Sequence, residues 1–387
     1  MVEEVRKHLT ERLIPFWKSM KDKEYGGYYG YMDYDLKIDK KAEKGCILNS
    51  RILWFFSSAY LVLNDQALLT EAYHAYGFLR KKFLDTEKGG VFWSVDYDGT
   101  PKDTTKHTYN QAFAIYGLCA YYEASGDKQA LALAEELYHL IETKMRDADG
   151  YLEAFDRDFK PAQNEKLSEN GVEAVRSMNT LLHVMEAYTE LYRVSGEKEV
   201  ADKLKEILDI VDEKLYNREK KRQEVFFDLQ YHTLADLYSY GHDIEAAWLI
   251  NRTTEVLKDE AYAEKMDRIT KEMAENVYKE AFDGHSIPAE AENGVVKEDR
   301  IWWVQAEGIN GYVDAYQREP EKKEYLEAAK SLWEFIKEFM IDKREGSEWF
   351  WYVAPDGTPS HEPIVEPWKC PYHNGRMCLE VILRNVA

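Results

Sequence analysis

The sequence lacks the features that mark several classes of protein. It has only four cysteines, Cys46, Cys119, Cys370 and Cys378, and no two of them form a CxxC pair. Neither a disulfide framework nor a cysteine-rich metal site is therefore expected. No Pro-, Gly- or Ser-rich linker interrupts the chain. We expect residues 1–387 to form a single catalytic domain in a reducing, cytoplasmic compartment.

The chain also lacks an apolar leader and an excess of positive charge. Residues 1–7 are mostly charged or polar, and no continuous run of about 18 apolar residues occurs, so neither an export signal nor a membrane span is expected. The sequence has 51 Lys and Arg against 72 Asp and Glu, a formal net charge of −21. Such a surface repels a phosphate backbone or an anionic membrane. We expect a small, neutral ligand and no nucleic-acid or membrane partner.

What the sequence does contain is a repeated pattern of two helices. An aromatic-rich apolar stretch, a short polar break and a second stretch with small residues at helical spacing recur five times. The clearest breaks are at 125–127 and 195–197, and weaker copies begin at Tyr60, near Leu257 and at Tyr316. The copies start roughly 60–70 residues apart, the length of a two-helix unit. Because each hairpin alone leaves an apolar face exposed, neighbours must stack, which predicts an all-α closed ring, or helical toroid.

Three connectors between the helices follow a different pattern. Residues 24–31, 88–99 and 347–357 are rich in aromatic residues and have turn residues at their tips, which predicts short β-hairpins. On a helical ring, such hairpins project from one rim and either wall a central cavity or only cap the helix ends. The aromatic content of 14% fits a surface that stacks on sugar rings, although helix packing accounts for most of it.

Several polar residues occur where helix packing does not require them. Four histidines begin or end apolar helical runs: His107, His183, His242 and His373. Asn179 precedes His183 by four residues and Glu245 follows His242 by three, so each pair shares one helix face. Inner helices of a closed ring turn their inner faces toward one axis, and we expect the histidines to converge there.

Three kinds of chemistry are open to such a cluster. A zinc site is one, with the ligand set His183, His242, Glu245 and His373; the lack of an HExxH motif and the presence of Arg51 argue against it. General acid and base catalysis by two histidines is the second, because imidazole titrates near neutral pH and can both take and give a proton. A glycosidase with Glu245 and Glu307 as its carboxylate pair is the third, but it leaves the histidines without a role.

Four segments of the chain carry a resemblance to a known family. Residues 49–54, 239–248, 302–307 and 368–376 resemble, in order and spacing, those of the cellobiose 2-epimerases in the N-acylglucosamine 2-epimerase superfamily. The resemblance spans nearly the whole chain. It implies an (α/α)6 barrel of six inner and six outer helices, with no cofactor and no metal.

The resemblance also implies an activity. A family member inverts carbon 2 of the reducing-end glucose of β-1,4-linked disaccharides, converting cellobiose to glucosylmannose and lactose to epilactose. The alternatives are an N-acylglucosamine 2-epimerase, a mannose or glucose isomerase, a glycoside hydrolase of the helical-ring type and a non-catalytic sugar-binding toroid. Whether the protein is a monomer or a homodimer stays open.

The inversion itself sets the residue roles. It requires ring opening, removal of the carbon 2 proton, an enediolate intermediate and return of a proton on the opposite face, so two bases are needed. We expect His242 and His373 to flank carbon 2, and the resemblance implies that His373 also opens the ring. The resemblance implies that Arg51 and His183 stabilise the enediolate oxygen, and we expect Glu245 to orient His242.

The remaining candidates would bind the sugar. Trp303 and Trp368 are expected to offer their ring faces to the apolar faces of the sugar. Matched positions in the family imply that Tyr109, Asn179 and Glu307 hydrogen-bond sugar hydroxyls, and Trp248 is expected to pack the site wall. If the base that removes the carbon 2 proton returns it to carbon 1, a ketose forms, so slow aldose–ketose isomerisation is a further hypothesis.

Overall fold

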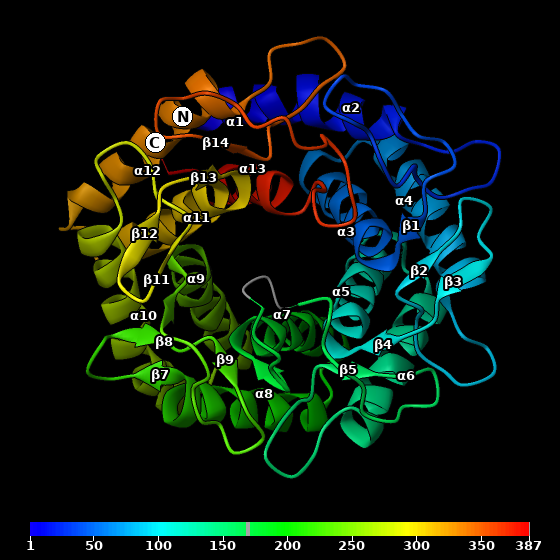
Figure 1. The fold of residues 1–387 in the computed structure, drawn as a ribbon, viewed down its shortest axis with the longest axis horizontal. Coiled ribbons are helices and arrows are strands. Elements are labelled where there is room, and N and C mark those ends of the chain that lie inside the picture. The colour runs from blue at the N-terminus through cyan, green and yellow to red at the C-terminus, as the bar shows by residue number, and fades with distance from the viewer. Residues whose placement is uncertain (168–170, 387) are drawn as a thin grey trace.

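A computed structural model describes residues 1–167 and 171–386, and its helices form two concentric rings (Figure 1). Each inner helix contacts the next, and the last contacts the first, so the inner ring closes. The inner helices are α3 (Cys46–Leu63), α5 (Thr108–Ser125), α7 (Met178–Ser195), α9 (Tyr240–Leu257), α11 (Trp302–Arg318) and α13 (His373–Arg384).

The outer ring surrounds these helices, and it includes the N-terminal end of the chain. It consists of the N-terminal run α1 (Val2–His8), η1 (Leu9–Leu13) and α2 (Ile14–Ser19), then α4 (Gln66–Phe78), α6 (Lys128–Lys144), α8 (Lys198–Ile210), α10 (Glu260–Glu280) and α12 (Lys323–Phe335). The π-helical turns η2 (Leu79–Phe83), η3 (Val211–Leu215) and η4 (Ile336–Met340) extend three of them. Because α1 packs on α13, the termini lie side by side in Figure 1. The predicted (α/α)6 barrel is confirmed.

Short links join each inner helix to the next outer helix, as the repeat predicts. After α5 and α7 the chain turns at Gly126 and Gly196, whose φ angles of 72° and 71° lie in the left-handed region that favours glycine. Asp127 then caps α6 by accepting a hydrogen bond from the backbone N–H of Gln129. The weaker copies of the repeat also end inner helices, at Asn64 and Lys258.

Long connectors at the opposite end of the barrel carry the strands. These are β1 (Lys44–Gly45), β2 (Ser94–Val95), β3 (Pro101–Asp103), β4 (Lys106–His107), β5 (Ala154–Phe155), β6 (Arg176–Ser177), β7 (Tyr216–Asn217), β8 (Arg222–Gln223), β9 (Phe226–Phe227), β10 (Leu237–Tyr238), β11 (Glu290–Glu292), β12 (Val295–Lys297), β13 (Arg300–Ile301) and β14 (Tyr352–Val353). The pairs β1–β2, β4–β5, β6–β9, β10–β11 and β13–β14 are antiparallel. In each, a strand that enters an inner helix pairs with a strand from the next connector. These five pairs hold the beginnings of the inner helices together along one rim.

The three predicted hairpins have different outcomes. Residues 88–99 contribute β2, which forms a hairpin with β3. Residues 24–31 form no named strand, and Tyr28 makes only an isolated bridge to Lys21. In residues 347–357, β14 pairs with β13 of a different connector. The hairpin prediction is confirmed only in part for these two segments, because each folds back through a single bridge: Tyr28 pairs with Lys21, and Val353 pairs with Pro359 across the turn at 355–357. A strand of two residues gains few hydrogen bonds by folding back on itself, and β14 gains more by pairing with β13 of the neighbouring connector.

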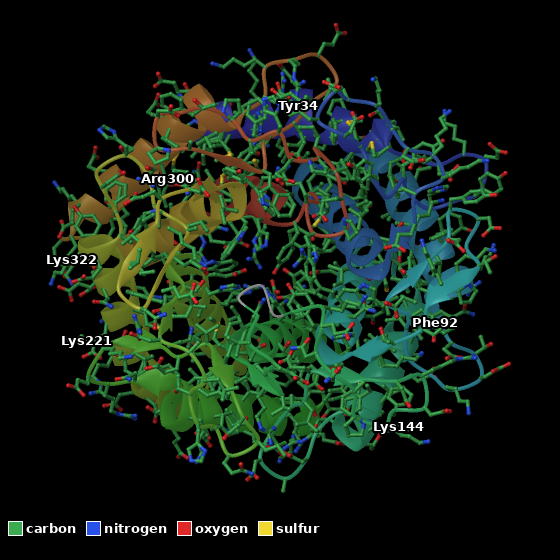
Figure 2. The ribbon with its side chains drawn as sticks, in the orientation of Figure 1. Tyr34, Phe92, Lys144, Lys221, Arg300 and Lys322 are labelled. Carbon is green, nitrogen blue, oxygen red and sulfur yellow. The ribbon has the colours of Figure 1, made fainter. Side chains whose placement is uncertain are left out.

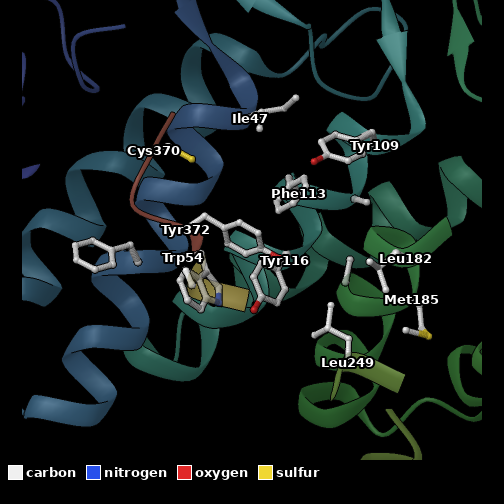
Figure 3. Packing of buried hydrophobic residues seen from close by; sticks show 14 of the residues in the cluster. Ile47, Trp54, Tyr109, Phe113, Tyr116, Leu182, Met185, Leu249, Cys370 and Tyr372 are labelled. Atoms are coloured by element: carbon white, nitrogen blue, oxygen red, sulfur yellow. The ribbon is translucent and has the colours of Figure 1, made fainter. Parts of the chain in front are cut away.

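The core fills the space between the two rings and continues between the helices of the inner ring. By length and composition one helix in the described part of the chain, α3, could cross a membrane, but 72% of it is buried inside the barrel, as expected of an inner helix. Aromatic rings fill the space between α3, α5 and α13, with the ring centroid of Tyr372 5.6 Å from that of Trp54 and 5.1 Å from that of Phe113 (Figure 3). Charged side chains such as Lys144 and Lys322 lie at the outer edge (Figure 2).

Candidate active site

A cavity of about 240 Å³ lies where the inner helices begin, at the rim that carries the strands. All six inner helices, or the residues just before them, contribute to its wall. Eight of the eleven predicted site residues line it: Arg51, Tyr109, Asn179, His183, His242, Trp303, Trp368 and His373. His107, the remaining histidine of the sequence cluster, lies in β4 against Trp93 and does not line this cavity.

The two histidines predicted as bases contact the same tryptophan. The ring centroid of Trp303 lies 4.6 Å from that of His242 and 5.5 Å from that of His373. A glycine permits this packing, because a Cβ atom at Gly241 would lie 2.6 Å from the indole of Trp303. The structure therefore brings residues of α9, α11 and α13 to one wall of the cavity.

Each histidine of the cavity has a hydrogen-bond partner on Nδ1. Nδ1 of His373 lies 2.8 Å from Oε1 of Glu307, and Nδ1 of His183 lies 2.9 Å from Oε2 of Glu186. An ionised carboxylate only accepts hydrogen bonds, so Nδ1 carries the hydrogen in both rings and Nε2 has the lone pair. Among the described residues no hydrogen bond to Nε2 of either ring is found. Both rings thus keep a basic nitrogen for a ligand.

The prediction that Glu245 orients His242 is wrong. Nδ1 of His242 lies 2.7 Å from Oγ of Ser239, and the carboxylate of Glu245 accepts a hydrogen bond from Arg376. Glu245 shares a helix face with His242 but lies one turn deeper in the barrel. At that depth the guanidinium of Arg376 is the donor within reach, and the side chain of Glu245 bonds to it and not to His242.

Two further predictions, for Glu307 and Trp248, are also corrected. Glu307 is 0% exposed, so it cannot hydrogen-bond a sugar hydroxyl in this structure. Its Oε1 atom binds His373 and its Oε2 atom accepts a hydrogen bond from Nε1 of Trp248 at 3.0 Å. Neither residue lines the cavity. Glu307 holds the imidazole of His373, and Trp248 in turn holds Glu307.

A buried ion cluster lies beneath the histidines, and sequence reasoning missed it. Arg376, 1% exposed, donates hydrogen bonds to Glu186, Glu245 and Glu307, the last at 2.7 Å. Burial raises the pKa of Glu307, but Arg376 and His373 outweigh it and lower that pKa to about 2. Burial and the neighbouring Glu307 charge hold the pKa of Glu245 well above its usual value. The cluster therefore favours an ionised Glu307 and disfavours a second negative charge on Glu245.

The geometry does not assemble the zinc ligand set that the sequence left open. Within the described residues, the metal-binding groups that meet are Glu245, Glu307 and His373, not the three histidines. Arg376 already bonds both carboxylates of that group, so a guanidinium lies beside the carboxylates that would bind a cation. The glycosidase alternative also fails, because Glu245 and Glu307 are both 0% exposed and cannot flank a glycosidic bond.

Arg51 enters the cavity from α3 and is held on several sides. Its Nη2 atom donates to the hydroxyl of Tyr109 at 2.8 Å, and Nη1 lies 3.4 Å from the carbonyl oxygen of Trp368. The guanidinium carbon lies 4.1 Å from the ring centroid of Phe113 and 4.6 Å from that of Tyr372. Fixed by these contacts, the positive charge is ready to stabilise an anionic oxygen without rearrangement.

Burial keeps the histidines of the cavity neutral. It lowers the pKa of His242 to about 3, and the positive charge that His183 and His373 can carry acts in the same direction. Burial also lowers the pKa of His373 to about 3, although Glu307 opposes the shift. The pKa of His183 is lowered as well, mainly by burial. At neutral pH the cavity therefore presents imidazole rings that can accept protons.

Several residues that line the cavity were not predicted from the sequence. They include Lys166, Ser239, Glu290, Trp302 and Trp351. Ser239 directly precedes α9, a position where serine is common as a helix cap, so its sequence context indicated a structural role. Lys166 and Glu290 lie in connectors whose paths the sequence pattern does not determine. Lys166 pairs with Asp103 at 3.0 Å.

A second cavity, of about 270 Å³, lies at the other end of the barrel, where the inner helices end. Its wall includes Leu61 and Leu383, and no histidine. Its two arginines are already paired, Arg193 with Glu123 and Glu190, and Arg252 with Glu190. We therefore assign the chemistry to the histidine-lined cavity, whose lone pairs and fixed guanidinium are suited to moving a proton next to a carbonyl group.

Comparison with known proteins agrees with this assignment. The family model of N-acylglucosamine 2-epimerase (GlcNAc 2-epimerase) matches residues 27–375. The chain is 55% identical to a cellobiose 2-epimerase of Eubacterium cellulosolvens and 45% identical to one of Dictyoglomus turgidum, each over 98% of both chains. A solved sugar epimerase from a ruminal bacterium has a TM-score of 0.98 at 49% identity, over 100% of both chains. A D-mannose isomerase, 21% identical over 98% of this chain and 97% of its own, shares the fold with a TM-score of 0.85.

Proposed function

The chain belongs to the N-acylglucosamine 2-epimerase family, and we propose that it is a cellobiose 2-epimerase, an enzyme of the isomerase class. The resemblance expected from the four sequence segments is confirmed over the full chain. The observation that carries the proposal is the pair His242 and His373. Both line one cavity, and each has its Nδ1 atom occupied by a protein partner. The substrate we propose is the reducing-end glucose of a β-1,4-linked disaccharide such as cellobiose or lactose.

In the proposed reaction His373 first opens the sugar ring. Its Nε2 atom takes the proton of the anomeric hydroxyl while the bond between carbon 1 and the ring oxygen breaks and solvent protonates that oxygen. His373 becomes an imidazolium beside the Glu307 carboxylate, which stabilises the positive charge. The aldehyde that forms acidifies the proton on carbon 2. His373 then holds the proton that the last step needs.

His242 acts as the base on carbon 2. Its neutral imidazole removes the proton, and the electron pair of the C–H bond forms the enediolate, with the negative charge on the carbonyl oxygen. His373 then donates its proton to the opposite face of carbon 2, which inverts the centre and restores the aldehyde. The proton on His242 returns to the anomeric oxygen as the ring closes, and the ring oxygen releases its proton to solvent.

Arg51 stabilises the enediolate oxygen in this scheme, whereas His183, whose Nδ1–H is bound to Glu186, has only the Nε2 lone pair left and accepts a hydrogen bond from a sugar hydroxyl. Positioned proton transfer contributes about 10²–10⁴-fold, which is not enough for a carbon acid this weak, so the developing negative charge also needs a partner. The guanidinium of Arg51 lines the cavity and is fixed by Tyr109. His183 lines the cavity beside it, with its ring centroid 5.1 Å from that of Tyr109.

The aromatic residues bind the sugar rings. Trp303 and Trp368 line the cavity and offer apolar faces for the carbon–hydrogen side of the rings. Asn179 also lines the cavity, and its Oδ1 atom is buried without a partner among the described residues. A buried amide oxygen without a partner is costly, and a sugar hydroxyl would satisfy it. The reaction uses only side chains of the protein, so we propose no cofactor, and a cytoplasmic location where disaccharides are metabolised.

One experiment separates this function from its alternatives. Cellobiose is incubated with the enzyme in deuterium oxide and followed by NMR. The epimerase yields glucosylmannose with one solvent deuterium at carbon 2. Release of glucose would indicate a hydrolase, and unchanged cellobiose would indicate a binding protein. Turnover of N-acetylglucosamine or of mannose in place of cellobiose would favour another member of the family.

A slow aldose–ketose isomerisation is a second activity of the same site. The enediolate can take its proton at carbon 1 as well as at carbon 2, because one intermediate serves both products. Lactose would then give a little lactulose besides epilactose. Long incubation that yields epilactose but never lactulose would exclude this side reaction.

A further inference from the structure

Ser239 occupies the start of α9 without capping the helix. A serine at this position usually accepts a hydrogen bond from a backbone N–H of the first turn. Ser177, at the same position of α7, does so by accepting from the backbone N–H of Thr180 at 3.1 Å. The hydroxyl of Ser239 makes no such bond and lies 2.7 Å from Nδ1 of His242 instead. The helix loses a cap, and the imidazole gains a partner.

The partner of His242 differs in charge from those of the other two histidines in the cavity. His183 and His373 each bind a buried carboxylate, Glu186 and Glu307. His242 binds a neutral hydroxyl. The charged or titratable groups that act on His242 lie on other helices: His183 on α7 and His373 on α13, which oppose its protonation, and Glu307 on α11, which favours it. None of them replaces a carboxylate in direct contact.

We propose that Ser239 is a positioning residue that aims Nε2 of His242 at carbon 2 of the sugar and, being a hydroxyl, leaves His242 without the carboxylate that supports an imidazolium at His373. Ser239 is 5% exposed and lines the cavity beside His242. Its bond to Nδ1 holds one edge of the His242 ring, so the ring cannot rotate freely. A carboxylate here would stabilise an imidazolium, and His242 would then hold its proton too tightly to return it as the sugar ring closes.

This inference rests on the proposed function, and three variants test it with cellobiose as substrate. Ser239→Ala removes the partner, and we expect kcat to fall by about tenfold or more, with KM changed far less, because misplacing a reacting group by about 1 Å can cost 10²-fold. Ser239→Thr keeps the hydroxyl and should restore most of kcat. Ser239→Asp supplies a carboxylate, which also caps helices well. It should raise the pKa of His242 and move the acid limb of the kcat/KM profile to higher pH.

Ser177→Ala is the matched control, because Ser177 caps α7 and does not line the cavity. It should lower the melting temperature more than Ser239→Ala does, while kcat stays near that of the wild type. If the wild-type enzyme leaves cellobiose unchanged, the proposed function is wrong. If the wild type is active but Ser239→Ala matches its kcat, or Ser239→Asp leaves the pH profile unmoved, the role of Ser239 alone is overturned. Should Ser239→Ala fail to fold by circular dichroism, the Thr and Asp variants decide between the same outcomes.

Discussion

Nδ1 of His373 donates a hydrogen bond to Oε1 of Glu307, which lies 66 residues earlier in the chain, at 2.8 Å. The bond joins the first residue of α13 to the interior of α11. Because the carboxylate also binds Arg376, it stays ionised. It fixes the orientation of the imidazole and favours its protonated form. His373 is thus equipped to hold a proton between two steps of the reaction.

The first prediction concerns the charge of Glu307. Glu307→Gln keeps the shape of the side chain and loses its negative charge, so an imidazolium at His373 is no longer stabilised. We expect kcat for cellobiose to fall by about 10²–10⁴-fold, the range that a positioned proton transfer contributes. Steady-state kinetics measure the effect, and circular dichroism checks that the fold is retained. A variant with wild-type kcat would show that the carboxylate has no part in proton transfer.

The second prediction concerns Arg51. Arg51→Lys keeps a positive charge but cannot reach both Tyr109 and the enediolate oxygen as the planar guanidinium does. We expect kcat to fall by about 10²–10³-fold, the loss seen when one donor to a developing oxyanion is removed. Tyr109→Phe removes only the hydroxyl that accepts from Arg51 and should have a smaller effect. Equal losses in the two variants would mean that Arg51 acts through Tyr109.

The helical part of the fold could be predicted because its signals are local. The breaks at 125–127 and 195–197 contain a glycine that takes a left-handed conformation, followed by the start of an outer helix. The rim strands could be predicted only in part, because a strand of two residues has no periodic pattern. Its partner comes from the next connector of the ring, as β14 pairs with β13, and that pairing depends on the closed barrel.

The site, like the fold, could be predicted only in part from the sequence. His242, His373 and Arg51 stand in recognisable segments, and they line one cavity. The partners of these residues were not predictable, because they come from distant parts of the chain: Arg376 binds Glu186 across 190 residues and Glu245 across 131. Glu245 was assigned to His242 because both share a helix face. Spacing predicts the helix face, and only the closure of the inner ring, which brings Arg376 of α13 to Glu245 of α9, decides which group the side chain binds.

The third prediction is the pH dependence of kcat/KM, which reports the free enzyme. The scheme requires both His242 and His373 to be neutral before the sugar binds, and burial lowers the pKa of each to about 3. Activity should therefore not decline as the pH falls through the ordinary histidine value of about 6.5. In Glu307→Gln any acid limb should move to lower pH, because the carboxylate no longer supports protonation of His373. A decline in kcat/KM near pH 6.5 in the wild type would contradict the expectation that both histidines are neutral.

The last prediction concerns stability and a histidine outside the site. Nε1 of Trp349 donates a hydrogen bond to Nε2 of His8 at 2.8 Å, so this nitrogen must be unprotonated, and burial, followed by the charge of Arg12, lowers the pKa of His8 to about 3. Between pH 6.5 and 3 the unfolded chain binds a proton at His8 that the native protein does not. The contribution of His8 is thus complete above pH 6.5 and is lost on acidification, by at most about 1.4 kcal/mol for each pH unit.

His8→Gln tests this directly, because a glutamine Oε1 atom can accept the same hydrogen bond from Trp349 and does not titrate. Melting temperatures of the wild type and the variant are measured from pH 7 to pH 5 by circular dichroism. As the pH falls, we expect the melting temperature of the wild type to drop further than that of the variant. Two curves that stay parallel over this range would show that the imidazole of His8 is not held neutral by the bond that joins α1 to the segment before β14.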